Sequence, residues 1–194
     1  MSEAEDTLRA DARANRGRIL EVARDALSAD PDVSLNAIAK AAGVGAGTLY
    51  RHFPSREALV LAVYRNEIDG LVKLAPSLLN KHAPMKAFHL WCDRLIQFGK
   101  MKQGIADLLR ATRVNQKPEE TYFPMLDAVC KLMRACESAG DIHPGADAED
   151  FLMFLGFLAQ ILPTPDGEAR ARRLLALAFR GLSEKPTQAT SSPP

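Results

Sequence analysis

The sequence has little cysteine and no long hydrophobic run. Three cysteines among 194 residues are too few, and odd in number, for a disulfide framework. We interpret Cys92, Cys130 and Cys136 as reduced, buried thiols. The most apolar run, 151–162, has 12 residues and contains Gln160, whereas a membrane span needs about 20. Because the first residues also lack an apolar secretory stretch, we expect a soluble, cytoplasmic protein without membrane contact.

An excess of charge of either sign is also missing. The chain has 25 Lys and Arg against 24 Asp and Glu, which gives a net charge of +1. This balance excludes a strongly basic coating protein but is compatible with a small basic face on a neutral body. Apolar residues make up 47% of the chain and charged residues 25%, which is typical of a globular protein.

Motifs of catalysis and metal binding are absent as well. The sequence contains no G-x-S-x-G, no H-E-x-x-H and no paired C-x-x-C. His82 and His89 are seven residues apart, but Pro84 lies between them and no carboxylate completes a ligand set. The glycines in 43–47 follow no apolar strand and precede no Gly-Lys-Ser/Thr, so a phosphate loop is not indicated. We therefore expect no enzyme, no cofactor and no metal site.

Helical periodicity dominates what is present. Apolar residues from Ile19 to Leu27 recur at helical spacing, and Ala29 to Asp32 interrupts them. Ser34 is a good N-cap for a short helix that Gly43 ends, and Ser55 caps a long helix extending to about Lys73. The first 75 or so residues thus predict helix, short helix, turn, short helix and long helix.

The second half also favours helices only. Pro76 and Pro84 predict a break that starts a second module, and four amphipathic stretches follow between residues 85 and 182. Asp147 caps the apolar run 151–162. No alternating strand pattern is present, so the predicted fold class is all-α. We expect a disordered N-terminal arm over 1–12 and a disordered tail over 184–194.

Residues 34–53 carry the most specific signal. Two short helices joined by a tight turn at Gly43 predict a helix-turn-helix, whose second helix can lie in a DNA major groove. Ala39 and Ala42 are small enough to let the two helices approach closely. The small residues 45–48 begin the second helix, where a phosphate or base edge must come near. Residues 50–52 then offer a hydroxyl, a cation and an imidazole.

The helix-turn-helix and the residues around it resemble a known family. Residues 16–65 are similar to the DNA-binding domain of the TetR family of transcriptional regulators, with the core IAKAAGVGAGTLYRHFPSREAL. Gly45 departs from the capping Ser or Thr that is common in the family, and Arg56 replaces a commoner Lys. The resemblance implies a three-helix DNA-binding domain over 13–54. A long helix joins it to a helical effector-binding and dimerisation domain over 55–183.

The resemblance also implies a set of DNA-binding residues. Thr48, Tyr50 and His52 would contact phosphates or base edges, and Gly47 would let the backbone approach closely. Cations from both ends of the domain would lie near the DNA backbone, and residues 13–56 carry seven cations against four acids, a net +3. The full expected set is Arg16, Arg18, Ser34, Lys40, Gly45, Ala46, Gly47, Thr48, Tyr50, Arg51, His52 and Arg56.

Plainer roles stay open for several of these residues. Tyr50 could pack partly against the long helix, and His52 could be a solvated surface histidine. Arg16 and Arg18 could belong to a solvated face. Leu49 and Phe53 are expected in the core, without a role at the DNA.

The C-terminal half is rich in aromatic residues and methionine. A filled core explains this composition, but such walls also suit an adaptable apolar ligand pocket. By resemblance this half holds the effector, here an unknown small apolar molecule. The expected walls are Phe88, Trp91, Phe98, Met101, Met125 and Met133. A polar group of the ligand could be oriented by His89, Asn115, Tyr122 or Gln160.

Dimerisation is also expected in this half. The run 151–162 is apolar nearly all round, so one face can cover its own core while another meets a partner. Paired with the last helix across a two-fold axis it would form a four-helix interface, as in the family. The expected interface residues are Phe151, Phe154, Leu155, Leu158, Leu174, Leu175, Ala178 and Leu182.

Together these features predict a homodimeric regulator, in the first place an effector-responsive repressor, on a pseudo-palindromic double-stranded DNA operator. An activator, or a regulator without an effector, is the alternative of the same class. An all-α small-molecule enzyme or carrier that uses a C-terminal cavity is the alternative of a different class.

Overall fold

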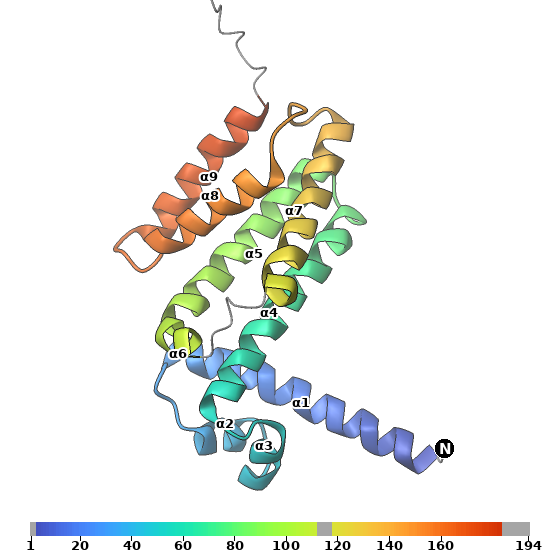
Figure 1. Cartoon of the computed structure of the whole chain (residues 1–194), viewed down its shortest axis with the longest axis vertical. Coiled ribbons are helices and arrows are strands. Elements are labelled where there is room, and N and C mark those ends of the chain that lie inside the picture. Colours follow the sequence, from blue (N-terminus) through green and yellow to red (C-terminus); the bar gives the residue numbers. More distant parts are fainter. Residues whose placement is uncertain (1–2, 112–117, 184–194) are drawn as a thin grey trace, which may run out of the picture. The chain divides into compact units, whose positions relative to one another are not determined.

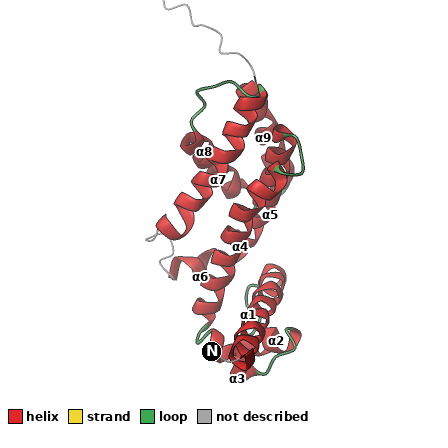
Figure 2. Ribbon diagram, turned by 90° about the vertical axis from the view of Figure 1, so that its right-hand side faces the viewer, coloured by secondary structure: helices red, strands yellow, loops and turns green. Residues whose placement is uncertain are grey.

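The computed structural model describes residues 3–111 and 118–183, and all regular structure within these ranges is helical (Figure 2). This confirms the all-α fold class. In chain order the helices are α1 (Glu3–Ala29), α2 (Leu35–Ala41), α3 (Ala46–His52), α4 (Arg56–Leu79), α5 (Pro84–Gly104), α6 (Ala106–Ala111), α7 (Pro118–Ala139), α8 (Ala148–Ile161) and α9 (Gly167–Ser183) (Figure 1).

These helices form two compact units. The first contains the described residues up to Gly70 together with those in 97–121, and the second contains 71–96 and the described residues from Tyr122 on. Helices α4, α5 and α7 therefore each contribute residues to both units, and the boundaries fall inside long helices. The predicted tail over 184–194 lies outside the described residues.

The expectation of a disordered arm over 1–12 is wrong for residues 3–12, the part of it that the structure describes. Helix α1 already begins at Glu3, so residues 3–12 are helical. The segment 3–14, EAEDTLRADARA, is made mostly of Ala, Leu, Arg and Glu, which have high helix propensity. Three of its four acidic residues, Glu3, Glu5 and Asp6, come first, which suits the positive end of the helix dipole. A polar composition had indicated disorder, but the same residues are good helix formers.

Three predicted helix boundaries in the first unit are confirmed. The Oγ of Ser34 accepts a hydrogen bond from the Ala37 N–H at 3.1 Å, and the Oγ of Ser55 accepts one from the Ala58 N–H at 3.2 Å. Gly43 has a φ of +67°, a left-handed conformation that favours glycine after a helix. The core that these turns enclose consists of Ile19, Leu20, Ala23, Leu27, Ile38, Ala39, Ala42, Leu49, Phe53, Leu59, Val60 and Val63.

The break expected at Pro76 is absent. Helix α4 continues through Pro76 to Leu79 instead of ending near Lys73. Pro76 lacks an N–H, but its carbonyl still accepts from the Asn80 N–H at 3.1 Å. The neighbouring Ala75 is fully buried, so packing favours the helical path. Pro84 is the first residue of α5, where a missing N–H costs nothing. The only interruption between α4 and α5 is therefore the segment 80–83.

The second unit has an aromatic centre. The ring of Phe88 lies 5.2 Å from that of Phe151 and 5.0 Å from that of Phe179, the latter edge-on. Trp91 is fully buried, and its indole N–H donates to the Leu71 carbonyl at 2.9 Å. These contacts join α5 to the residues of α4 in this unit and to α8 and α9.

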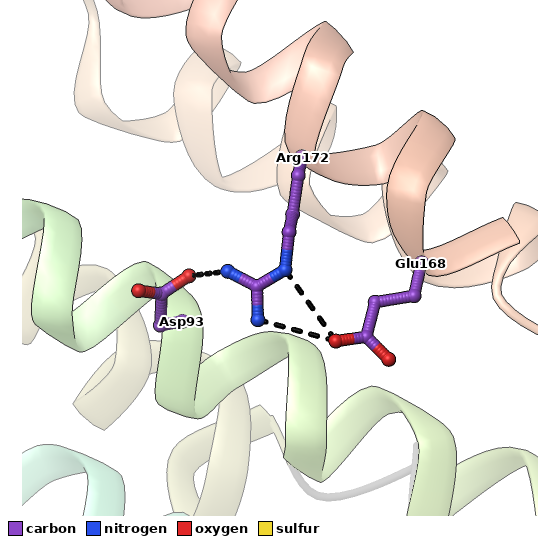
Figure 3. A network of polar contacts seen from close by, with 3 residues as sticks. All are labelled: Asp93, Glu168 and Arg172. Carbon is purple, nitrogen blue, oxygen red and sulfur yellow. Dashed lines mark hydrogen bonds and ion pairs between the residues drawn. The ribbon is translucent and has the colours of Figure 1, made fainter.

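Helices α8 and α9 lie side by side in this unit (Figure 1). As predicted, the carboxylate of Asp147 caps α8 by accepting from the N–H groups of Glu149 and Asp150. The turn to α9 is tight at Gly167, because a Cβ there would stand 2.1 Å from the Ile161 carbonyl oxygen. On the surface, Arg172 of α9 bridges Asp93 of α5 and Glu168 (Figure 3).

The three cysteines are free thiols. Cys92 and Cys136 are buried, but Cys130 is only half-buried, so the expectation that all three are buried is wrong for Cys130. Burial raises the pKa of the Cys92 thiol well above its ordinary value, and it raises the pKa of Cys136 to about 11. Both buried thiols are therefore protonated near neutral pH.

Candidate nucleic-acid interface

Helix α3 begins with very small residues. Gly45 is its N-cap and provides no side chain to cap the helix, as its sequence predicts. Gly45, Ala46 and Gly47 are all exposed. The backbone of the first turn of α3 is therefore accessible to a large partner, since only methyl groups and hydrogens cover it.

Apolar residues fix the other face of α3. Leu49 is fully buried and Phe53 is 2% exposed, whereas Tyr50 is 46% exposed. Because Leu49 and Phe53 are four residues apart, they form one face of the helix and leave Tyr50 and Arg51 outside the core. At 46% exposure, Tyr50 has both a covered part and a surface that is open to a partner.

The guanidinium of Arg51 folds back on its own helix. Its Nε donates to the Gly47 carbonyl at 3.3 Å, and its Nη2 donates to the Oγ1 of Thr48 at 3.1 Å. These bonds restrict an otherwise flexible cation and hold it beside the Thr48 hydroxyl. Arg51 and Thr48 therefore present a shared polar surface on α3.

Arg16 and His52 line a common pocket, although they are 36 positions apart in the sequence. The Cζ of Arg16 lies 5.5 Å from the centroid of the Phe53 ring, and the ring of His52 lies 6.1 Å from it. Phe53 thus has a cation–π contact with Arg16 in addition to its expected core role. The pocket has a volume of about 420 Å³ and is lined by Arg16, His52, Phe53, Ala58, Leu61, Ala62, Arg65, Asn66 and Asp69. Sequence reasoning missed this grouping, because nothing local pairs α1 with the end of α3.

The other expected DNA-binding residues differ in their surroundings. Lys40 is exposed in the last turn of α2, and Arg18 is exposed and donates to the Oδ1 of Asn15 at 2.6 Å. The hydroxyl of Ser34 serves as the N-cap described above. Arg56 is half-buried, and its guanidinium donates to the carbonyls of Pro31 and Val33 in the α1–α2 loop. Arg56 therefore has internal partners that the sequence did not indicate.

Ion pairs support the helices behind α3. Glu67 of α4 is 5% exposed and lies 3.7 Å from the guanidinium of Arg24 in α1. The hydrogen bond from Arg24 to Asp25 and the charge of Asp25 raise the pKa of Arg24, and the charge of Glu67 raises it further. Such contacts join α1 to α4 within the first unit and fix the scaffold on which α2 and α3 pack.

The expected effector residues divide between the units. Phe88, Trp91, Met125 and Met133 are buried in the second unit, whereas Phe98 and Met101 are buried in the first. Burial of all six is what a filled core also predicts.

The polar residues expected to orient an effector have other surroundings. The Tyr122 hydroxyl donates to the Oε1 of Glu149 at 2.5 Å, and this bond raises the pKa of Tyr122. His89 is exposed, with its ring edge-on to Phe179 at 4.2 Å. Gln160 is exposed, and Asn115 lies outside the described residues.

The expected dimer residues are mostly covered by the chain itself. Phe151, Leu155, Leu158 and Leu175 are each only 5–6% exposed. Phe154, Ala178 and Leu182 are half-buried, and Leu174 is 37% exposed. Three apolar residues of the same helices are far more exposed and were not predicted: Met153 at 55%, Phe157 at 61% and Leu177 at 53%.

Clusters of metal ligands and membrane-spanning helices are both missing from the described parts of the chain. Across 3–111 and 118–183, no group of three or more His, Cys, Asp or Glu side chains is arranged to hold a metal ion. Within the same ranges, no helix is both long and apolar enough to traverse a lipid bilayer.

A helix-turn-helix with an exposed, small-residue start on its second helix defines a DNA-binding protein of the helix-turn-helix class. Comparison with family models is more specific. Residues 19–63 match the model of bacterial regulatory proteins of the tetR family. Residues 83–184 match the C-terminal domain of SbtR-like transcriptional regulators.

Known proteins agree with these matches. The TetR transcriptional regulator SCO0520 from Streptomyces coelicolor is 38% identical, with a TM-score of 0.77 over 86% of this chain and 97% of that one. A TetR transcription regulatory protein from Mycobacterium vanbaalenii is 30% identical, with a TM-score of 0.75 over 90% of this chain and 98% of that one. The chain therefore belongs to the TetR family of transcriptional regulators, as residues 16–65 predicted.

A curated relative matches over a shorter length. An HTH-type transcriptional regulator of Staphylococcus aureus (strain USA300) is 33% identical over 94 residues, which are 47% of this chain and 51% of the relative. The chain thus spans about half the length of the curated relatives it matches.

Proposed function

We propose that the protein is a homodimeric repressor that acts in the cytoplasm, binds a pseudo-palindromic DNA operator and releases it when a small apolar effector binds. We assign it no enzymatic activity. The observation that supports this proposal most is the geometry of α3. Its small, exposed first turn is followed by exposed Tyr50 and by Arg51 held beside Thr48.

Contacts with DNA follow from that geometry. The residues of the first turn, 45–47, allow the DNA to approach the backbone, and Thr48 and Tyr50 reach base edges or phosphates in the major groove. Lys40 and Arg51 supply positive charge nearby. Arg16 and His52, which line one pocket, contact the flanking backbone together with Arg18.

Two recognition helices are needed for a two-fold symmetric operator, so we include dimerisation in the proposal. Helices α8 and α9 expose Met153, Phe157, Leu174 and Leu177, large apolar side chains that are normally covered in a soluble regulator. A two-fold pairing of these faces covers them. It places half-sites about one helical turn of DNA apart, or slightly more.

The proposed effector acts on operator affinity through helix α4. Helix α4 starts next to α3 and extends into the second unit, so a ligand in the second unit that shifts α4 also shifts the DNA-binding domain. Buried Trp91, Met125 and Met133 are the side chains we expect nearest such a ligand. Coupling of about 1–3 kcal/mol, which is ~5- to 150-fold in operator affinity, is the usual scale.

The test is selection of bound duplexes from a random DNA pool at near-physiological salt. We expect the full chain to enrich a two-fold symmetric motif and the Tyr50→Ala variant to enrich it weakly or not at all. Binding without enrichment, lost uniformly as salt rises, contradicts operator recognition. With the operator known, a reporter assay separates repression from activation. A screen of small apolar ligands tests the effector response, and operator affinity that no ligand changes contradicts that response.

A further inference from the structure

Arg56, the first residue of α4, contacts the loop between α1 and α2. Its Nη1 donates to the Val33 carbonyl at 2.5 Å, and its Nη2 donates to the Pro31 carbonyl. These bonds connect residues 23 and 25 positions apart. Both terminal nitrogens of one planar guanidinium therefore donate hydrogen bonds to the same short loop. Fork-like donation of this kind is a property of arginine that lysine lacks.

The loop that Arg56 holds determines where α2 begins. Asp30 organises it from within, because its Oδ1 accepts from the Asp32 N–H at 2.9 Å and its carbonyl accepts from the Val33 N–H at 3.2 Å. Ser34, the N-cap of α2, follows directly after Val33. Arg56 therefore ties the start of α4 to the start of α2.

Helix α3 depends on this connection from both sides. It packs on α2, and only residues 53–55 separate its end from Arg56. A guanidinium that links the loop before α2 to the residue after α3 closes a ring around the helix-turn-helix. This arrangement limits how far α2 and α3 can rotate relative to α4.

We infer that Arg56 is a positioning residue, which holds the helix-turn-helix in its DNA-reading geometry through the carbonyls of Pro31 and Val33. The inference replaces the phosphate contact that its positive charge suggested, and its DNA-binding part rests on the proposed function. The shape of the guanidinium matters here, because two separate nitrogens in one rigid plane each reach one of the two carbonyls.

The test compares three single variants: Arg56→Lys, which keeps the charge and loses the fork; Arg56→Gln, which loses both; and Lys40→Gln, a matched control that removes an exposed cation of α2. Amide hydrogen exchange of residues 33–38 is measured on the full chain without DNA. Affinity for the selected operator is measured over a series of salt concentrations. A thermal melt checks that each variant folds.

The positioning role predicts that both Arg56 variants exchange faster in 33–38 and bind the operator about tenfold or more weakly, with the salt dependence unchanged. The Lys40→Gln variant keeps normal exchange, and its log–log salt slope falls by about 0.9, as for one lost phosphate contact.

A phosphate-contact role predicts the opposite pattern. Arg56→Lys then behaves like the unchanged protein in both measurements, and Arg56→Gln loses about 0.9 of the salt slope. That result overturns the inference, as does faster exchange with unaltered operator affinity, or unaltered exchange in Arg56→Lys. If the unchanged protein selects no operator, the proposed function fails instead, and the exchange data decide by themselves whether Arg56 holds the loop.

Discussion

At the scale of single residues, the neighbouring side chains of Tyr50 and Arg51 on α3 have different surroundings. Arg51 is held by the Gly47 carbonyl and the Thr48 hydroxyl, whereas Tyr50 is 46% exposed. A restrained cation loses little rotamer freedom when DNA binds, and an exposed tyrosine offers a rigid ring and a hydroxyl. We expect both to contribute to DNA binding. Tyr50 is the cleaner test, because its removal leaves the two bonds of Arg51 within α3 in place.

We predict that Tyr50→Ala weakens operator binding by about 1–3 kcal/mol, which is ~5- to 150-fold. The cause is loss of a base or phosphate contact, since Tyr50 is not part of the core. The measurement is a titration of labelled operator, with the mass of the protein in solution as a control that its assembly is unchanged. Equal affinity of the variant and the unchanged protein would remove Tyr50 from the interface.

The buried thiol of Cys136 leads to a prediction about pH. Burial, with a smaller contribution from Asp141, raises the pKa of Cys136 from its ordinary value near 9 to about 11. Above pH 9 the unfolded chain releases this proton while the folded chain keeps it. The contribution to stability is therefore complete below pH 9 and is lost as the pH rises toward 11.

We expect Cys136→Ala to lose less stability than the unchanged protein between pH 9 and 11, because the variant no longer has this thiol to ionise. Cys130→Ala, at the half-buried cysteine of the same helix, is the matched control. Urea unfolding at several pH values measures the difference. Parallel pH profiles for Cys136→Ala and the unchanged protein would contradict the raised pKa of Cys136.

At the scale of helices and turns, the α8–α9 connection is tight at Gly167. A Cβ at Gly167 would lie 2.1 Å from the Ile161 carbonyl oxygen and 2.7 Å from that of Leu162. Both are backbone atoms, so a side chain cannot simply rotate away. The whole turn would have to move, and α9 with it.

Gly167→Ala should therefore destabilise the fold by roughly 1–3 kcal/mol, the usual cost of overpacking. Gly70→Ala is the control, because a Cβ at that exposed position of α4 meets nothing within 4 Å. It should be neutral or stabilise by about 0.5–1 kcal/mol, since Ala favours a helix over Gly. Chemical denaturation measures the free energy of unfolding of both variants. Equal stability of the two would show that the turn is less constrained than its distances indicate.

Helix boundaries show what the sequence can predict at this scale. The caps at Ser34, Ser55 and Asp147 were predicted correctly because a cap depends on a few adjacent residues. The continuation of α4 through Pro76 was not, because burial of Ala75 depends on residues far along the chain. The bonds of Arg56 to the α1–α2 loop were missed for the same reason.

At the scale of the whole molecule, the DNA-binding candidates were easier to predict than the dimer surface. The order and spacing of 34–53 are specific enough to assign the helix-turn-helix. Helix α8, in contrast, is apolar on nearly every side, so its periodicity does not tell an inward face from an outward one. The structure resolves this ambiguity, since Leu155 is 6% exposed and Phe157 is 61% exposed.

This difference changes how dimerisation should be tested. A charge at Leu155 would be buried in the protomer's own core and would unfold it, whatever the oligomeric state. A charge at Phe157 is tolerated by the protomer, because the side chain is exposed. We therefore expect Phe157→Glu to fold with normal stability and to exist as single chains in solution, since a dimer would bury two unpaired carboxylates.

The matched control for Phe157→Glu is Phe123→Glu, an equally drastic change at a phenylalanine of α7 that is 55% exposed. This variant should keep the mass of two chains and its affinity for the operator. Phe157→Glu should lose most operator affinity as well, because one recognition helix alone reads only one half-site. Light scattering and operator titration measure both properties. A Phe157→Glu protein that stays dimeric would show that the exposed face of α8 is not the interface, and a monomeric one with full operator affinity would show that a single chain suffices to bind.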